Sequence, residues 1–248
     1  MMVRELEGKT ALVTGATKGI GRAAALRLGA DGAAIVAVGR SQADGESLVA
    51  EIAAGGGRAI FVAGDVASST DWARIAQATT DAFGGCDIVV ASAGVSRPAP
   101  IREMPLSQYR DLNAINLKGC FFALQTGAKL IRAHGRGGSI ILVASIVGKI
   151  GVAGHSNYAA SKDGVRLMTK AAALELGPEK IRVNSLHPGM IRTDMTAGYP
   201  EKAIGPSIPL GRFGLPEEMA DAISFLAGPR SAFMTGAELV ADGGWIAQ

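Results

Sequence analysis

The sequence has few of the residues that bind metals or form disulfides. Its 248 residues include two cysteines, Cys86 and Cys120, and three histidines that lie far apart in the chain. Two cysteines are too few for the disulfide framework of a small secreted domain. Without a CxxC pair or clustered histidines we also expect no metal site. The corresponding prediction is a reducing environment and hence a cytoplasmic location.

Long apolar runs and blocks of like charge are also missing. No run of about 18 or more apolar residues is present, so we predict no membrane-spanning helix. The opening, MMVRELEGKTALV, is charged and lacks an apolar core, so we expect no secretory signal. The 25 basic and 22 acidic residues are interspersed, and aromatic residues make up 5% of the chain. Neither nucleic acid nor a membrane is therefore expected as a partner.

Glycine, by contrast, is abundant. The chain has 34 glycines, about twice the ~7% share of an average protein. They follow no collagen-like period and form no low-complexity tract. We therefore expect them at tight turns and at close approaches of the backbone.

Short apolar runs alternate along the chain with longer amphipathic stretches. Because the apolar runs lack polar alternation, helices are expected to cover both faces of a parallel sheet. The alternation predicts βαβ units, and so a doubly wound α/β fold of about seven strands in one domain, 1–248. Strands are expected at 10–14, 33–38, 59–63, 87–92, 139–145, 181–186 and 237–241, and helices at about 19–30, 42–54, 69–83, 107–133, 157–176 and 216–227.

One stretch fits neither pattern. Residues 196–214, TAGYPEKAIGPSIPLGRFG, are rich in proline and glycine. This composition favours a loop or lid over a domain boundary. We expect the loop to act as a lid over a substrate.

The first expected strand runs directly into a glycine-rich turn, TGATKGIG, at residues 14–21. Glycine permits positive φ and lets backbone N–H groups approach a pyrophosphate, and the N-terminus of the following helix adds a favourable dipole. Close packing of strand and helix could demand the same glycines, but the position after the first strand favours a dinucleotide site. The residues expected there are Gly15, Thr17, Lys18, Gly19, Ile20 and Gly21.

The end of the second strand bears on which dinucleotide is bound. In NAD sites an acidic residue here accepts hydrogen bonds from the ribose hydroxyls, whereas an arginine accommodates a 2′-phosphate. This strand ends at Gly39, Arg40 follows, and Lys18 is a second cation. Each cation could be an ordinary surface charge, but together they favour NADP(H), with NAD(H) as the alternative. Asp65 is a candidate for the adenine amino group, or else a helix N-terminal acid.

Tyr158 and Lys162 lie four residues apart in HSNYAASKDG and would share one helix face. A phenol transfers protons poorly near neutral pH unless a neighbouring cation stabilises its phenolate form. Such pairs also occur by chance, so the surroundings matter. Ser145 lies at the carboxyl edge of an expected strand, where open α/β sheets bind ligands. Asn116 is a polar residue among apolar neighbours and needs a partner.

As a set, these motifs resemble the short-chain dehydrogenase/reductase family, in its single-domain subgroup with a Rossmann fold. The resemblance covers essentially the whole chain. The overall pattern is similar to that of 3-oxoacyl-carrier-protein reductases, and very similar patterns occur among dehydrogenases for steroids, sugars and small alcohols. TGATKGIG is similar to the family's cofactor motif and YAASK to its YxxxK motif, with Ser145 and Asn116 at the remaining positions of the catalytic tetrad. HPGMIRTDM, at 187–195, is similar to the segment that holds the nicotinamide. It implies contacts from Pro188, Gly189, Ile191 and Thr193.

The resemblance implies hydride transfer between the nicotinamide and a carbonyl or secondary alcohol. Tyr158 would act as general acid or base, and Ser145 would position the substrate oxygen. Lys162 would stabilise the phenolate and bind the nicotinamide ribose. Asn116, at an interruption of the family's helix, would hold a water that links Lys162 to solvent.

One motif departs from the family pattern. The family usually reads NNAG after the fourth strand, whereas this chain has ASAG at 91–94. Ser92 can supply only a shorter hydroxyl than asparagine. Cofactor contacts are still expected in this region and beside Asp65, from Val66, Ser92, Ala93 and Gly94.

The substrate stays open between several classes of carbonyl or alcohol. The main hypothesis is an NADP(H)-dependent ketoreductase, with 3-oxoacyl thioesters as one candidate class. The alternatives are an NAD-dependent alcohol, sugar or hydroxysteroid dehydrogenase and, more remotely, a non-catalytic dinucleotide sensor. The family resemblance implies a homotetramer or homodimer. Lys129, Arg132 and Arg136 could meet an acidic carrier protein or could simply form a solvated helix end.

Overall fold

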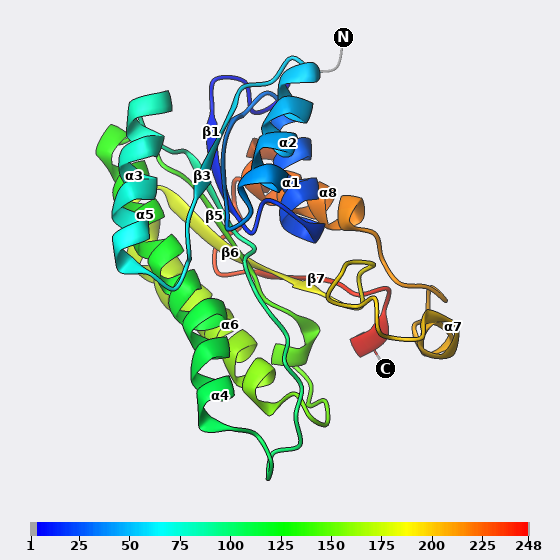
Figure 1. Ribbon diagram of the computed structural model, residues 1–248. Helices are drawn as coiled ribbons and strands as arrows, with labels where there is room; N and C mark the ends of the chain where they lie inside the picture. Colours follow the sequence, from blue (N-terminus) through cyan, green and yellow to red (C-terminus); the bar gives the residue numbers. More distant parts are fainter. Residues whose placement is uncertain (1–3, 248) are drawn as a thin grey trace.

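A seven-stranded sheet forms the centre of the protein (Figure 1). The computed structural model describes residues 4–247. Neighbouring strands are parallel, in the order β3-β2-β1-β4-β5-β6-β7. They are β1 (Thr10–Thr14), β2 (Ala34–Gly39), β3 (Ala59–Ala63), β4 (Ile88–Ala91), β5 (Gly138–Val143), β6 (Ile181–Pro188) and β7 (Glu238–Ala241). The predicted doubly wound α/β fold is confirmed, with strand ends that differ from expectation by at most two residues.

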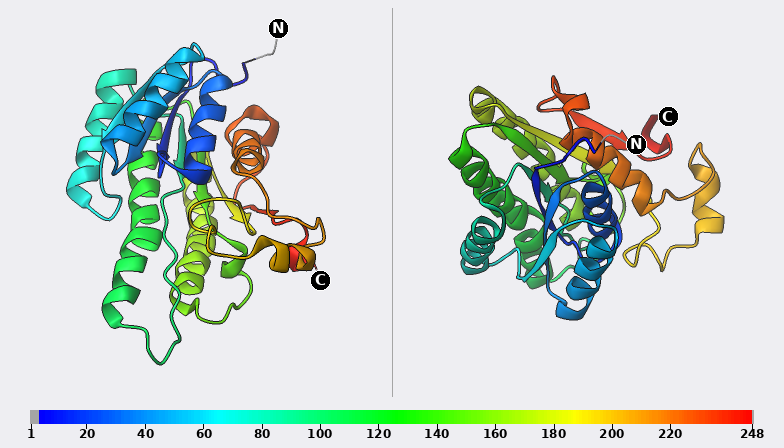
Figure 2. Two further views of the ribbon diagram at one scale, coloured as in Figure 1. Left: turned by 45° about the vertical axis from the view of Figure 1, so that its right-hand side comes forward. Right: turned by 90° about the horizontal axis from the view of Figure 1, so that it is seen from above.

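Helices cover both faces of this sheet, as the views in Figures 1 and 2 show. The helices are α1 (Gly19–Ala30), α2 (Gln42–Ala54), α3 (Ser69–Phe83), α4 (Leu106–Asn113), α5 (Gly119–His134), α6 (Ser156–Leu176), α7 (Glu201–Ile204) and α8 (Pro216–Ala227). Helices α1, α2 and α8 lie on one face, and α3, α5 and α6 lie on the other. Over residues 4–247, no helix has both the length and the apolar character needed to cross a bilayer.

Successive side chains of each strand enter two separate cores. In β1, Ala11 and Val13 face the core under α1 and α8, whereas Leu12 faces the core under α5 and α6. All three are fully buried. This explains why the central strands read as continuous apolar runs, because neither face meets water. The edge strands β3 and β7 are only partly buried.

Two regions differ from the expected elements. The stretch 107–133, expected as one helix, consists of α4, a π-helical turn (Ala114–Lys118) and α5. In that turn the N–H of Gly119 bonds to the carbonyl of Ala114, five residues earlier. The stretch 196–214, expected as a loop, includes the short helix α7. It lies near the C-terminal turn (Figure 2), where the N–H of Leu210 donates to the carbonyl of Gly243.

The sheet reverses its winding between β1 and β4. Strand β1 pairs with β2 on one side and with β4 on the other, and Thr14 at the end of β1 stands beside Ala91 at the end of β4. In open α/β sheets, ligands bind in the crevice at the carboxyl ends of the strands at such a point. The fold thus brings the glycine loop after β1 next to the loop after β4.

Candidate active site

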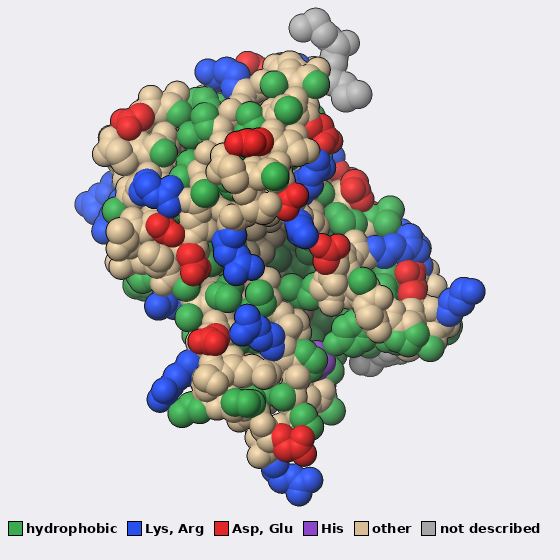
Figure 3. Space-filling view, in the orientation of Figure 1, with side chains coloured by type: hydrophobic (Ala, Val, Ile, Leu, Met, Phe, Trp, Pro, Cys, Tyr) green, Lys and Arg blue, Asp and Glu red, His purple; other side chains and the backbone are tan. Residues whose placement is uncertain are grey.

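A cavity of about 490 Å³ opens at this crevice. Its size is within the range of small-molecule sites, roughly 300–1,000 Å³. Figure 3 shows the surface hollowed in the middle of this face, with basic and acidic side chains at the rim. Every residue predicted to bind the cofactor lines it, as do three of the four predicted catalytic residues, but Asn116 does not. The predicted residues that line it are Gly15, Thr17, Lys18, Gly19, Ile20, Gly21, Arg40, Asp65, Val66, Ser92, Ala93, Gly94, Ser145, Tyr158, Lys162, Pro188, Gly189, Ile191 and Thr193.

The glycine loop is packed too tightly to hold side chains. A Cβ on Gly21 would lie 2.3 Å from the carbonyl oxygen of Gly15, and a Cβ on Gly15 would lie 2.8 Å from the Cα of Ala93. Gly15 and Gly19 also have positive φ angles of 65° and 51°, which glycine adopts without steric cost. The loop therefore turns the chain sharply from β1 into α1 and presents the helix N-terminus to the cavity, a favourable place for a phosphate.

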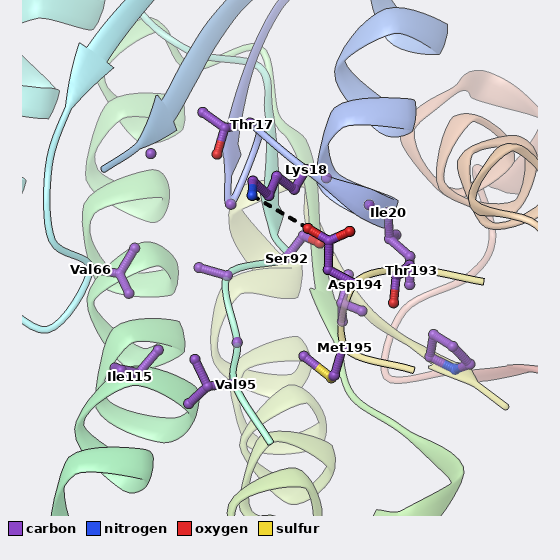
Figure 4. A pocket seen from close by; sticks show the side chains of 18 of the residues that line it. Thr17, Lys18, Ile20, Val66, Ser92, Val95, Ile115, Thr193, Asp194 and Met195 are labelled. Atoms are coloured by element: carbon purple, nitrogen blue, oxygen red, sulfur yellow. Dashed lines mark ion pairs between the residues drawn. The ribbon is translucent and has the colours of Figure 1, made fainter. Parts of the chain in front are cut away.

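The two predicted phosphate-binding cations, Arg40 and Lys18, are both exposed at the cavity. Lys18 already has a partner, because its Nζ lies 3.4 Å from a carboxylate oxygen of Asp194 (Figure 4). The Oδ1 of Asp65 accepts a hydrogen bond from the N–H of Ala67 at 2.9 Å. One oxygen of Asp65 thus serves the turn into α3, as expected of a helix N-terminal acid.

The ASAG loop is joined to β1 through backbone groups. The hydroxyl oxygen of Thr14 accepts hydrogen bonds from the N–H groups of Ser92 and Ala93, each at 3.2 Å. This link does not depend on the side chain at position 92. The departure from the NNAG pattern therefore leaves the β1–β4 junction intact.

Tyr158 and Lys162 do share one face of α6. The Nζ of Lys162 lies 5.6 Å from the centre of the Tyr158 ring. Lys162 is 4% exposed, and its Nζ donates to the carbonyl of Val143 at 2.8 Å. An ammonium has three N–H donors, and Val143 is its only protein acceptor within residues 4–247. Two donors of a buried cation are therefore available to a bound molecule.

Asn116 lies behind the cavity wall, in the π-helical turn, and is fully buried. Its Oδ1 accepts from the N–H of Val95 and its Nδ2 donates to the carbonyl of Val95, both at 2.9 Å. The Nδ2 also lies 3.2 Å from the hydroxyl of Ser161. The side chain thus fixes the loop after β4 against α6. The water-holding role implied by the resemblance stays a prediction.

Ser145 lies two residues beyond the end of β5, with 7% of its surface exposed toward the cavity. Its Oγ accepts a hydrogen bond from the N–H of Val147 at 3.1 Å, which leaves the hydroxyl proton free to donate. Its carbonyl oxygen lies 3.1 Å from Nδ1 of His187. The sequence assigned no role to this histidine.

The segment after β6 returns to the glycine loop. A Cβ on Gly19 would lie 3.1 Å from the side chain of Thr193, and a Cβ on Gly189 would lie 2.8 Å from the Cα of Asp242. Residues 187–195 are therefore packed between the glycine loop and the C-terminal turn.

The stretch 196–214 is anchored by two arginine–glutamate pairs. Arg192 pairs with Glu201 at 2.7 Å, and Arg212 pairs with Glu218 at 2.6 Å. The hydrogen bond from Arg212, together with a backbone N–H, holds the pKa of Glu218 at about 2. These bonds fix the base of the expected lid.

Near its start, this stretch contacts the residue that precedes α6. The hydroxyl of Tyr199 lies 3.2 Å from Nε2 of His155. His155 precedes α6, and its ring stands edge-on to that of Tyr158, with centres 6.5 Å apart. The stretch 196–214 is therefore connected to Tyr158 through His155.

Several cavity residues were not among those predicted from the sequence. Val95, Ile115 and Met195 present apolar side chains there (Figure 4). Val95 and Ile115 come from separate segments that only the fold brings together, whereas Met195 is the last residue of HPGMIRTDM, the segment already expected at the nicotinamide. The other lining residues that sequence reasoning missed are Val38, Gly64, Val143, Ala144, Asp194 and Thr196.

The three cations considered for an acidic partner lie at the opposite end of the sheet. They occupy the end of α5 and the turn that follows it. Arg132 pairs with Glu179, and Arg136 pairs with Asp87, immediately before β4, each at 3.4 Å. Two of them thus serve local ion pairs at the amino ends of the strands, away from the cavity.

The parallel sheet and the glycine loop at its switch point are the features of a dinucleotide-binding α/β fold. The family model described as enoyl-(acyl carrier protein) reductase matches residues 15–246. A 3-oxoacyl-[acyl-carrier-protein] reductase of Synechocystis is 39% identical over 97% of this chain and 98% of its own length. An L-rhamnose 1-dehydrogenase (NAD(P)(+)) of Azotobacter vinelandii is 38% identical over 95% of this chain and 96% of its own.

A crystal structure of a short-chain type dehydrogenase/reductase from Mycobacterium marinum superimposes with a TM-score of 0.96 at 36% identity, covering 99% of this chain and 98% of that one. The chain belongs to the short-chain dehydrogenase/reductase family, whose members use NAD(P) cofactors. It is an oxidoreductase that acts on CH–OH and C=O groups.

Proposed function

We propose that the protein is an NADP(H)-dependent ketoreductase, with Tyr158 as general acid and base. The observation that carries this proposal is the convergence of Tyr158, Lys162 and Ser145 with the glycine loop on one cavity. Relatives of nearly equal identity are named for a 3-oxoacyl thioester and for a sugar. A 3-oxoacyl thioester is therefore one candidate substrate among several carbonyl classes.

The cavity fits a nicotinamide dinucleotide in shape and in donors. The close packing at Gly15 and Gly21 keeps side chains out of the loop, so that backbone groups and the N-terminus of α1 border the cavity there. Lys162, on the α6 side of the cavity, has two N–H donors available for ribose hydroxyls. When bound, the nicotinamide supplies or accepts the hydride.

The preference for NADP(H) rests on the charges near the adenosine position. Arg40 and Lys18 are cations at the cavity, and Gly39 stands where an NAD-type site would have a carboxylate. An NAD-dependent dehydrogenase is the competing reading, and a comparison of kcat/KM with NADPH and NADH separates the two.

The remaining roles concern one proton and one oxygen. Tyr158 donates its proton to the substrate oxygen in reduction and accepts it in oxidation. The Lys162 ammonium beside the ring stabilises the phenolate that this transfer leaves. Ser145 donates a hydrogen bond to the same oxygen and holds it near Tyr158. Asn116 keeps the loop at Val95 in place, and we propose that it also holds a water that relays the proton.

A mutational experiment tests the assignment. Tyr158→Phe should lower kcat by about 100- to 10,000-fold, the usual contribution of general acid–base catalysis, and leave the Kd of NADPH nearly unchanged. The assay would use a panel of a 3-oxoacyl thioester, a cyclic ketone and a small diketone with both cofactors. Tyr109→Phe, on the exposed helix α4, is the matched control. Near-normal turnover of Tyr158→Phe would overturn the proposal.

We also propose that the chain assembles as a homotetramer or homodimer. Leu174 on α6 is 83% exposed, and Phe233, shortly before β7, is fully exposed. In the proposed assembly these two apolar side chains are covered by a second copy of the chain. Light scattering after size exclusion measures the state, and a monomer at micromolar concentration would contradict it. The lid role of 196–214 and the cytoplasmic location stay predictions.

A further inference from the structure

His187 lies beside the proposed reacting groups but has no part in the chemistry above. It is the last residue of β6 before Pro188 and is fully buried. Its ring makes two polar contacts: Nδ1 lies 3.1 Å from the carbonyl oxygen of Ser145, and Nε2 lies 2.9 Å from the hydroxyl of Ser185. A buried imidazole with both nitrogens engaged has a fixed orientation.

The chemistry of these partners determines the tautomer. A carbonyl oxygen can only accept, so Nδ1 carries the hydrogen and donates it to Ser145. Burial lowers the pKa of His187, so the ring is neutral at neutral pH and Nε2 accepts from Ser185. The carbonyl of Ala237, 3.4 Å from the Ser185 hydroxyl, already accepts from the N–H of Ser185 at 3.0 Å. With Nδ1 protonated and Nε2 accepting from Ser185, both ring nitrogens, the Ser185 hydroxyl and the two carbonyls all have hydrogen-bond partners.

Ser145 needs such a contact because it lies beyond the sheet. The last hydrogen bond between β5 and β6 joins the N–H of Ala144 to the carbonyl of Leu186, at 2.8 Å. The carbonyl of Ser145 is then held by Nδ1 of His187 and by the N–H of Gly148, at 3.1 Å each. The direction of the Ser145 carbonyl and that of its Oγ are coupled through one Cα, at which φ is −171° and ψ is 157°.

We propose that His187 is a positioning residue for Ser145. Its Nδ1–H fixes the Ser145 carbonyl, and this aims the Ser145 hydroxyl at the substrate oxygen. The inference rests on the proposed function, because it takes Ser145 to be the group that binds that oxygen.

Two amide substitutions at this position form a matched test. In His187→Asn the side-chain N–H₂ stands near the place of Nδ1 and can still donate to Ser145, whereas the contact with Ser185 is lost. In His187→Gln the amide stands near the place of Nε2, so the contact with Ser185 is kept and that with Ser145 is lost. A merely structural histidine would make both variants equally poor.

The positioning role predicts that kcat differs between His187→Gln and His187→Asn. His187→Gln should lower kcat by roughly 10- to 100-fold, as small misplacements of reacting groups do, with the Kd of NADPH unchanged. His187→Asn should restore most of that loss. On a Ser145→Ala background, His187→Gln should have little further effect, because the two residues act as one unit.

The outcomes separate this inference from the proposed function. If Ser145→Ala turns over normally, the proposed role of Ser145 is wrong. If Ser145→Ala is impaired but the two His187 variants have equal kcat, only the positioning role is wrong. Additive losses in the Ser145→Ala, His187→Gln double variant would also overturn it. Thermal unfolding of each variant shows that the compared proteins are folded.

Discussion

The methyl group of Thr17 occupies the space in which a side chain on Gly39 would begin. A Cβ on Gly39 would lie 2.7 Å from Cγ2 of Thr17, too close for either atom to stay in place. The carboxylate that selects NAD in related folds would start from this position. The glycine loop and the end of β2 are thus fitted to each other without an acid.

The Thr17–Gly39 contact predicts how the cofactor preference can be changed. Gly39→Asp alone should weaken binding of both cofactors, because the new side chain displaces Thr17. Thr17→Ala with Gly39→Asp should accept the carboxylate and shift the ratio of kcat/KM toward NADH.

Arg40→Asp should lower kcat/KM for NADPH by about tenfold or more, since a charge-assisted hydrogen bond is worth about 1.5–3 kcal/mol. An unchanged NADPH/NADH ratio in Arg40→Asp would contradict the assignment.

The glycine loop gives a second prediction. Gly21→Ala should abolish measurable cofactor binding, because its Cβ would lie 2.3 Å from the backbone oxygen of Gly15 and the loop must move. Gly177→Ala is the control, since nothing lies within 4 Å of a Cβ there and its φ of −54° suits alanine. That variant should gain about 0.4–1 kcal/mol of stability. Fluorescence titration with NADPH and chemical unfolding measure the two effects.

The carboxylate of Glu238 makes stability depend on pH. Burial alone would raise the pKa of Glu238, but hydrogen bonds from Lys149, Lys170 and Arg166 outweigh it and hold the pKa at about 2 instead of 4.5. Because the folded-state pKa is the lower one, the stabilisation is complete above pH 4.5 and is lost as the pH falls toward 2.

Between pH 5 and pH 2, chemical unfolding should therefore show a smaller loss of stability in Glu238→Gln than in the wild type. The difference between the two losses should not exceed what the titration of one carboxylate with a lowered pKa contributes. Glu218→Gln is the comparison, because the pKa of Glu218 is also about 2 but its side chain is 41% exposed. Water and salt screen an exposed pair, so its effect should be smaller. Equal effects would show that burial of Glu238 is unimportant.

Arg182 predicts a large loss of stability. From the start of β6 its guanidinium donates to the carbonyls of Leu226 and Gly228, at 2.9 and 3.2 Å, where α8 ends. Burial lowers the pKa of Arg182, yet the negative end of the helix dipole favours the cation.

Arg182→Met should remove the charged donor and leave these carbonyls only the hydroxyls of Ser139 and Ser231. We expect it to lower the free energy of unfolding by about 1.5–3 kcal/mol, the contribution of a hydrogen bond to a charged group. Arg4→Met removes an exposed pair with Glu7 at 3.8 Å and should change it by less than about 1 kcal/mol. Urea unfolding of both variants measures the difference, and a neutral Arg182→Met would refute the helix-end role.

The sequence predicts those parts of the molecule that depend on neighbours along the chain. Each strand is a short apolar run, and Tyr158 and Lys162 share a helix face by spacing alone, so both could be read directly. The contact of His187 with Ser145 joins positions 42 residues apart, and no local pattern marks it. Likewise, the pairing of Tyr199 with His155 depends on how the chain folds back after β6.

The π-helical turn that carries Asn116 restricts which changes in chain length this region tolerates. Such a turn is one residue longer than an α-helical turn, and each residue rotates a helix by about 100°. Removing one residue from 114–118 would therefore turn either the Asn116 amide away from Val95 or the buried face of α5, with Cys120 and Leu124, away from the sheet. A point substitution leaves the rotation of α5 relative to Asn116 unchanged, whereas the deletion of one residue must change it.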